Sequence, residues 1–175
     1  MKIVLTGFMG TGKTAVGKIL ARRLGYRFLD TDDLIEARAG RPISEIFNRD
    51  GETAFRLLES EVIASLAEAD RTVIATGGGA VLDPENMTNL GSNGLIFALL
   101  ADPAEIARRT ASQRHRPLLN VPDRETRIRE MLKKRLPYYQ RAGQCLETTG
   151  RTPEAIAGEI IRILETDKPQ KEPRP

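Results

Sequence analysis

Residues 7–14 read Gly7-Phe8-Met9-Gly10-Thr11-Gly12-Lys13-Thr14, and they match the pattern G-x-x-x-x-G-K-[ST]. An apolar run at 2–6 precedes the stretch and a segment of helical period at 13–24 follows it, which is the context that this pattern requires. Gly10 and Gly12 allow the backbone to turn successive N–H groups inward, and they carry no side chain that would block a phosphate oxygen. The stretch therefore predicts a phosphate-binding loop rather than a purely structural turn.

The two residues that end this loop indicate its ligand. Lys13 supplies a point charge suited to the β- and γ-phosphates of a nucleotide, and the Thr14 hydroxyl is placed to ligate Mg²⁺. The helix that begins here adds the positive end of its dipole. These residues imply a nucleoside triphosphate, ATP or GTP, bound together with Mg²⁺.

Short apolar or β-branched runs alternate with longer segments of helical period along the whole chain. This alternation predicts an α/β fold whose parallel sheet is covered by helices on both faces. The expected strands are 2–6, 27–29, 72–75, 95–100 and 144–147. The expected helices are 13–24, 32–39, 43–48, 52–69, 103–113, 123–141 and 153–165. We expect Thr152 to cap the last of them.

The chain length of 175 residues suits one domain, expected at 1–165, and a Pro- and Lys-containing tail at 166–175 is expected to be disordered. The single Cys145 cannot form an internal disulfide, so we expect a cytoplasmic protein. No apolar run approaches the roughly 20 residues that span a bilayer, and no signal peptide is expected. The absence of a long exposed apolar stripe favours a monomer.

Basic residues gather between Arg108 and Arg141, where eleven Lys and Arg accompany three Asp and Glu. The local charge is +8, which leaves −5 for the rest of the chain. Most of these residues are arginines, whose planar fork suits phosphates and carboxylates. They predict either a solvated helical face with ion pairs or a site for a multiply charged anion. Nucleic-acid binding is not expected, because no aromatic residues are interleaved for base stacking.

Three further stretches predict an acceptor site beside the phosphates. Asp30 and Asp32 follow the second expected strand, at the sheet edge where ligands of parallel sheets bind; capping of the next helix is the alternative, considered more for Asp32 than for Asp30. Residues 76–80 read Thr-Gly-Gly-Gly-Ala, and three glycines there favour backbone packed against a ligand. The stretch 114–119 predicts a lid that carries an arginine, with His115 as an exposed lid residue rather than a catalyst.

Taken in order, these motifs resemble those of the shikimate kinase family. The resemblance rests on G-F-M-G-T-G-K-T, L-D-T-D, D-G-E-x-x-F-R-x-x-E, T-G-G-G-A, R-P-L-L and K-R-x-P-Y-Y, and it covers about residues 2–165. It implies a three-layer P-loop kinase fold with a five-stranded parallel sheet, a substrate-binding helical subdomain at about 32–60 and a lid at about 111–123. It also implies transfer of phosphate from ATP, with Mg²⁺, to the 3-hydroxyl of shikimate, a step of aromatic amino acid biosynthesis.

The resemblance also implies roles for particular residues. The catalytic residues would be Lys13, Asp32 and Arg116. ATP would be bound by Gly10, Thr11, Gly12, Lys13, Thr14, Arg109, Arg116, Arg151 and Pro153, and Mg²⁺ by Thr14 and Asp30. Shikimate would be bound by Asp32, Arg56, Gly78, Gly79 and Arg135.

Two other functions stay open at this point. One is a different small-molecule kinase of the same fold, acting on gluconate or a nucleoside monophosphate, which need not keep Arg56, Arg135 and the three glycines together. The other is a regulatory nucleotide-binding protein without transferase activity.

Overall fold

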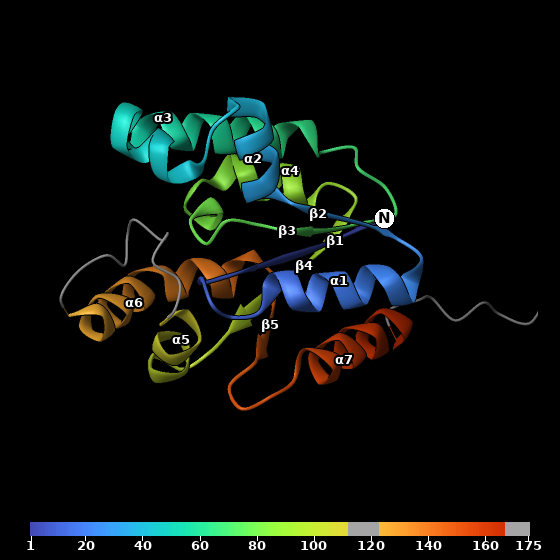
Figure 1. Cartoon of the computed structure of the whole chain (residues 1–175). Coiled ribbons are helices and arrows are strands. Elements are labelled where there is room, and N and C mark those ends of the chain that lie inside the picture. Colours follow the sequence, from blue (N-terminus) through green and yellow to red (C-terminus); the bar gives the residue numbers. More distant parts are fainter. Residues whose placement is uncertain (112–122, 167–175) are drawn as a thin grey trace, which may run out of the picture.

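The computed structural model describes residues 1–111 and 123–166. Its centre is a sheet of five parallel strands in the order β2-β3-β1-β4-β5 (Figure 1), which confirms the predicted fold class. The strands are β1 (Lys2–Gly7), β2 (Arg27–Asp30), β3 (Thr72–Ala75), β4 (Gly94–Leu100) and β5 (Gln144–Glu147). Every residue of β1 is buried, as expected of a central strand covered on both faces.

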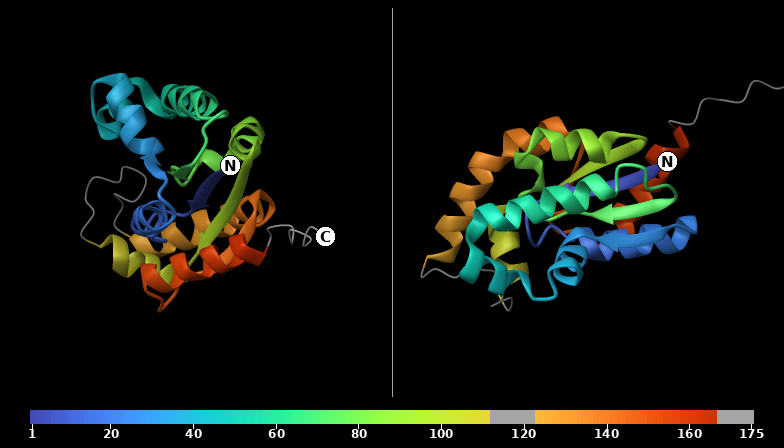
Figure 2. Two further views of the ribbon diagram at one scale, coloured as in Figure 1. Left: turned by 90° about the vertical axis from the view of Figure 1, so that its right-hand side faces the viewer. Right: turned by 90° about the horizontal axis from the view of Figure 1, so that it is seen from above.

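Helices cover both faces of this sheet. They are α1 (Lys13–Leu24), α2 (Thr31–Ala39), α3 (Ile43–Ser65), α4 (Pro84–Gly91), α5 (Pro103–Thr110), α6 (Arg124–Ala142) and α7 (Pro153–Thr166), with a short 3₁₀ helix, η1 (Ala80–Leu82). α1 packs beside α7 on one face, whereas α3 and α4 pack together on the other (Figures 1 and 2). Thr152 caps α7 through the Ala155 N–H, as predicted.

The core is divided by the sheet. On the α1 and α7 face, apolar residues such as Leu20 and Ile160 pack against Ile3 and Leu5 of β1. On the opposite face, Ile63 of α3 and Leu90 of α4 pack against Val4. A third cluster joins the phosphate-binding loop to α5 and α6, and it places these helices beside the carboxyl end of β1.

Most predicted elements match the structure, with shifts of one or two residues at strand ends. The predicted helix 52–69 was wrong at its end, because α3 stops at Ser65. α4 and η1 were not predicted, although Asp83 and Pro84 form a cap and first turn of a common kind. α5 ends at Thr110, and positions 112 and 113 of the predicted helix lie outside the described residues.

The predicted break between helices 43–48 and 52–69 is a kink inside α3. Gly51 has φ 83° and ψ 175°, values that are essentially confined to glycine, and the chain is helical on both sides of it. The kink turns the first part of α3 toward α2, and the two helices pack together. Here a glycine allows one long helix to change direction.

Several predictions fall outside the described residues. These include Arg116 and His115, nearly all of the proposed lid at 111–123, and all of the proposed tail except Thr166. Within the described residues, no helix is long and apolar enough to cross a membrane.

Candidate active site

A cavity of about 780 Å³ opens where the strands end, between the phosphate-binding loop, the start of α2, α3 and the glycine stretch after β3. β1, β2 and β3 are neighbours in the sheet and all end at this edge. β1 also pairs with β4 on its other side, so the cavity lies where the chain changes from one side of the sheet to the other. This position is the usual ligand site of an open parallel sheet.

The loop at residues 7–14 has the backbone geometry that its sequence predicts. Gly10 and Gly12 have φ 80° and 95°, which an L side chain would strain, and α1 begins directly after Gly12 with no side chain capping its first N–H groups. Lys13 Nζ donates to the carbonyls of Gly7 at 2.8 Å and Phe8 at 2.9 Å. The positive charge therefore lies over the loop, where an anionic ligand would meet it.

Asp30 joins the phosphate-binding loop to α2. Its Oδ2 accepts a hydrogen bond from Thr14 Oγ1 at 2.9 Å, and its Oδ1 accepts the Asp32 N–H at 3.1 Å as the cap of α2. Helix capping, the alternative considered more for Asp32, is thus found at Asp30. Asp32 is instead in the first turn of the helix and lines the cavity.

The oxygens of Thr14 and Asp30 are the donors that Mg²⁺ prefers. Among the described residues, no group of three or more His, Cys, Asp and Glu could hold a metal ion. Two protein oxygens still suit Mg²⁺, which keeps several waters and is completed by substrate phosphates. The residues present therefore fit a magnesium ion that arrives with a nucleotide.

Arg56 is held at the cavity by two carboxylates on its own helix. Its Nη1 donates to Glu59 Oε2 at 2.6 Å and its Nη2 to Glu52 Oε1 at 3.0 Å. Burial lowers the pKa of Arg56, but the charges and hydrogen bonds of Glu59 and Glu52 together outweigh this, and the pKa rises above its usual range. Burial raises the pKa of Glu59, while Arg56 limits that rise.

The glycine stretch 77–79 lies against these groups. A Cβ on Gly77 would approach Glu59 Oε1 to 2.7 Å, and one on Gly79 would lie 2.6 Å from Arg56 Cζ. Thr31 Oγ1 accepts the Gly77 N–H at 2.9 Å, which ties the stretch to α2. At Gly77 and Gly79, therefore, side chains that line the cavity approach too closely to leave room for a Cβ.

Arg135 reaches the same glycines from α6. It is only 8% exposed, and its Nη1 donates to the Gly78 carbonyl at 3.3 Å. Arg135 and Arg56 therefore place two guanidinium groups on one cavity, and they are the two arginines that the resemblance assigns to the acceptor. Two other arginines of that region, Arg108 and Arg129, are exposed and pair with Glu105 and Glu125 on their own helices.

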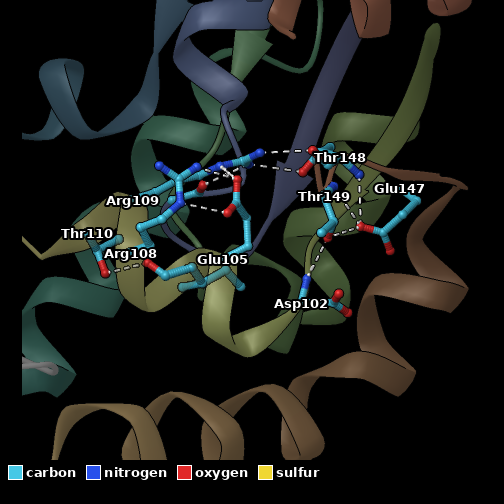
Figure 3. Close-up of polar contacts among 10 residues, drawn as sticks. Asp102, Glu105, Arg108, Arg109, Thr110, Glu147, Thr148 and Thr149 are labelled. Carbon is cyan, nitrogen blue, oxygen red and sulfur yellow. Dashed lines mark hydrogen bonds and ion pairs between the residues drawn. The ribbon is translucent and has the colours of Figure 1, made fainter. Parts of the chain in front are cut away.

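Arg109 lines the cavity and connects three parts of the chain (Figure 3). Its Nε donates to Glu105, its Nη1 to the Gly10 carbonyl at 3.3 Å and to Thr148 Oγ1 at 3.2 Å, and its Nη2 to the Thr148 carbonyl at 2.9 Å. It thus links α5 and the chain after β5 to the phosphate-binding loop.

The structure brings most of the predicted site residues to this one cavity. Lining it are Gly10, Gly12, Lys13, Thr14, Asp30, Asp32, Arg56, Gly78, Gly79, Arg109 and Arg135. Thr11 is buried within the loop, where its hydroxyl donates to the Phe8 carbonyl. Arg151 and Pro153 are not among the lining residues; Arg151 forms an ion pair with Glu159 of α7.

Two buried polar residues at the site received no predicted role, although both stand in motifs that carry the resemblance. Glu59 is 1% exposed, and its Oε1 has no hydrogen-bond partner among the described residues. Tyr139 is fully buried and contacts Gly78. Helical spacing could have found both, since Glu59 follows Arg56 by three residues and Tyr139 follows Arg135 by four.

Comparison with known proteins supplies the family. The sequence model of shikimate kinase matches residues 9–165. A shikimate kinase from Thermodesulfovibrio yellowstonii is 50% identical over 163 residues, which are 93% of this chain and 94% of that protein. The chain belongs to the shikimate kinase family. A shikimate kinase from Caldanaerobacter subterraneus is 48% identical over 160 residues, 91% of this chain and 94% of that protein.

The solved structures agree with this assignment. A shikimate kinase from Acinetobacter baumannii, in complex with shikimate, matches with a TM-score of 0.92 and 36% identity over 95% of this chain and 94% of that chain. The shikimate kinase fold thus extends over the described part of this chain, and the resemblance stated from its motifs is confirmed.

Proposed function

We propose that this shikimate kinase transfers the γ-phosphoryl group of ATP to the 3-hydroxyl of shikimate through the residues of the cavity described above. The observation that carries the proposal is convergence: Asp32, Arg56, Arg135 and the glycine stretch line the same cavity as Lys13 and the phosphate-binding loop. A protein that only binds a nucleotide would not need Asp32, Arg56, Arg135 and the glycine stretch beside the phosphate-binding loop.

The acceptor end of the cavity suits a small carboxylated triol. Arg56 and Arg135 offer guanidinium forks to the shikimate carboxylate. Asp32 accepts hydrogen bonds from its hydroxyls, and the N–H groups of Gly78 and Gly79 donate to it. Among the described residues, neither glycine N–H has a hydrogen-bond partner. The site therefore binds both the carboxylate and the hydroxyls of the acceptor.

The transfer itself is an in-line displacement. The 3-hydroxyl oxygen forms a bond to the γ-phosphorus as the bond to the bridging oxygen of ADP breaks, and Asp32 orients the hydroxyl and accepts its proton. Lys13 and, outside the described residues, Arg116 offset the charge on the equatorial oxygens. Mg²⁺, held by Thr14 and Asp30, neutralises phosphate charge when bound.

The nucleotide base is assigned to the other end of the cavity, near Arg109. Arg151 and Pro153 belong to this part of the proposal as well, although they do not line the cavity. A single kinase domain at 1–165 with a substrate-binding region at about 32–60 and a lid at about 111–123, a cytoplasmic location and a monomeric state complete the proposal.

The test is ADP formation in a coupled assay with a panel of acceptors: shikimate, gluconate and nucleoside monophosphates. We expect turnover with shikimate alone and a negligible rate without an acceptor. Turnover with gluconate or a nucleotide and none with shikimate would identify a different kinase of this fold. ATP binding without acceptor-dependent turnover would instead identify a regulatory nucleotide-binding protein.

A further inference from the structure

Tyr139 lies behind the proposed acceptor site without lining the cavity. Its side chain is fully buried in the cluster formed by the phosphate-binding loop, α5 and α6, which includes Phe8 and Met9. The phenol hydroxyl donates a hydrogen bond of 2.6 Å to the Gly78 carbonyl. A buried hydroxyl aimed at a glycine of the site is more than core packing requires, since a phenylalanine would fill the same space.

The Gly78 carbonyl accepts two hydrogen bonds from side chains of α6. Arg135 Nη1 donates to it at 3.3 Å, and Tyr139 does so one turn further along the helix. Residues four apart lie on one helix face, so the two side chains approach the carbonyl together. The orientations of the Gly78 carbonyl and of the Arg135 guanidinium are therefore coupled through one acceptor atom.

The hydrogen bond from Tyr139 to the Gly78 carbonyl also fixes the orientation of the Gly79 N–H group. No peptide bond among the described residues is cis, so the Gly78 carbonyl and the Gly79 N–H point in opposite directions. Glycines on both sides leave this peptide free to rotate unless something holds it. By anchoring the Gly78 carbonyl, Tyr139 directs the Gly79 N–H away from the phenol.

The phenol stays a donor over the pH range in which an enzyme is assayed. Burial raises the pKa of Tyr139 to about 12, against the opposing effect of the Arg135 charge. The hydroxyl proton is consequently present wherever the chain is folded and active.

We propose that Tyr139 is a positioning residue for the acceptor, whose hydroxyl holds the Gly78–Gly79 peptide and the Arg135 guanidinium in the orientation that binds shikimate. The inference rests on the proposed function, which assigns shikimate binding to these groups. Tyr139 itself touches neither substrate.

The experiment compares Tyr139→Phe with Tyr138→Phe. Tyr138 is the neighbouring residue, is 43% exposed and serves as the matched control. In the coupled assay, Tyr139→Phe should raise the KM for shikimate by about three- to thirtyfold, the effect of one lost hydrogen bond to a buried carbonyl. The KM for ATP should change less than twofold. Tyr138→Phe should match the wild type in both constants.

Three outcomes would overturn the inference while leaving the proposed function intact: an unchanged KM for shikimate, equal rises in the two KM values, or the same effect from Tyr138→Phe. Failure of the wild type to use shikimate would instead refute the proposed function. Combining Tyr139→Phe with Arg135→Ala adds a second check, because two groups that share one acceptor atom should show non-additive effects on the KM for shikimate.

A second variant keeps the hydroxyl in case Tyr139→Phe does not fold. A ring-fluorinated tyrosine at position 139 retains the shape but loses its proton at lower pH, and a phenolate cannot donate to a carbonyl. In that protein the KM for shikimate should rise with pH more steeply than in the wild type. Parallel pH profiles for the two proteins would contradict the positioning role.

Discussion

Arg56 occupies the space that a side chain on residue 79 would need. Gly79 has φ −101° and ψ −8°, a conformation open to alanine, so only the guanidinium group stands in the way. Gly78 differs, because a Cβ there would meet Gly7 O and Met9 N at 3.4 Å, close to ordinary contact. Adjacent glycines of the same stretch therefore serve different purposes.

This difference predicts different effects of two alanine substitutions. Gly79→Ala should displace the Arg56 guanidinium and raise the KM for shikimate about ten- to a hundredfold, the loss expected for a hydrogen bond to a charged group. Its melting temperature should stay near that of the wild type, since the end of a flexible side chain can move. Steady-state kinetics and thermal denaturation measure both quantities.

Gly78→Ala is the matched control for this prediction. The nearest atoms to its added methyl group are backbone atoms of the phosphate-binding loop rather than the Arg56 guanidinium, and the KM for shikimate should change only a few-fold. If the two substitutions raised the KM equally, Arg56 would not be placed as the structure has it.

Glu59 shows how the same residues are linked electrostatically. Protonation of a carboxylate whose pKa is raised by burial begins at a higher pH than in the unfolded chain, so acidification weakens its ion pair with Arg56. Asp32 lies close enough to add to this rise. Arg56 is consequently held best when Glu59 is ionised.

At the scale of the elements, the kink in α3 is the clearest conformational requirement. Among the described residues, apart from the chain neighbours of Gly51, no atom lies within 4 Å of the position that a Cβ on Gly51 would occupy, so the backbone conformation is what excludes a side chain. The predicted cost of a substitution is therefore one of strain alone.

Gly51→Ala should lower the free energy of unfolding by about 1 to 3 kcal/mol, the cost of a non-glycine residue in this region. For a chain of this size that corresponds to a fall of roughly 2 to 10 °C in melting temperature. Gly91→Ala is the control, because Gly91 ends α4 in a helical conformation and its Cβ would make an ordinary contact of 3.8 Å with Ile96. Equal melting temperatures for the two variants would refute the strain at Gly51.

The elements also show which parts of the fold the sequence determines. The bounds of α1 were predicted because the phosphate-binding loop and Gly25, its left-handed cap, mark both ends in the sequence. The end of α3 was predicted four residues late, since Leu66 and Ala69 continue the apolar spacing and still pack into the core after the helix has stopped. The spacing of apolar residues indicates which residues are buried, but it does not indicate where the helical backbone ends.

At the scale of the whole molecule, local motifs identified the family and much of the cavity, whereas buried polar residues were beyond them. Lys2 is fully buried, and its Nζ donates to main-chain carbonyls near the ends of α3 and α4, among them those of Leu66 and Asn89. Glu59 and Tyr139 are buried as well. Their spacing from Arg56 and Arg135 places them on the same helix faces, but their burial follows from tertiary packing, which spacing along the chain does not contain.

The charge distribution acquires a structural explanation at the same scale. Among the described arginines of the basic region, Arg109 and Arg135 line the cavity, while Arg108 and Arg129 pair with acidic residues of their own helices. Asp30 and Asp32 bring acidic groups to the same cavity. The near-neutral total of +3 therefore conceals a cavity that is lined by both basic and acidic side chains.

The central claim is that the phosphoryl group passes from ATP to one hydroxyl of shikimate within this cavity. Its most direct test is a phosphorus–proton correlation NMR spectrum of the product formed from ATP, Mg²⁺ and shikimate. We predict that the phosphorus of the new ester couples to the proton on carbon 3 and that ADP forms in equal amount. Coupling to a proton on another carbon, or release of free phosphate with shikimate unchanged, would contradict the account.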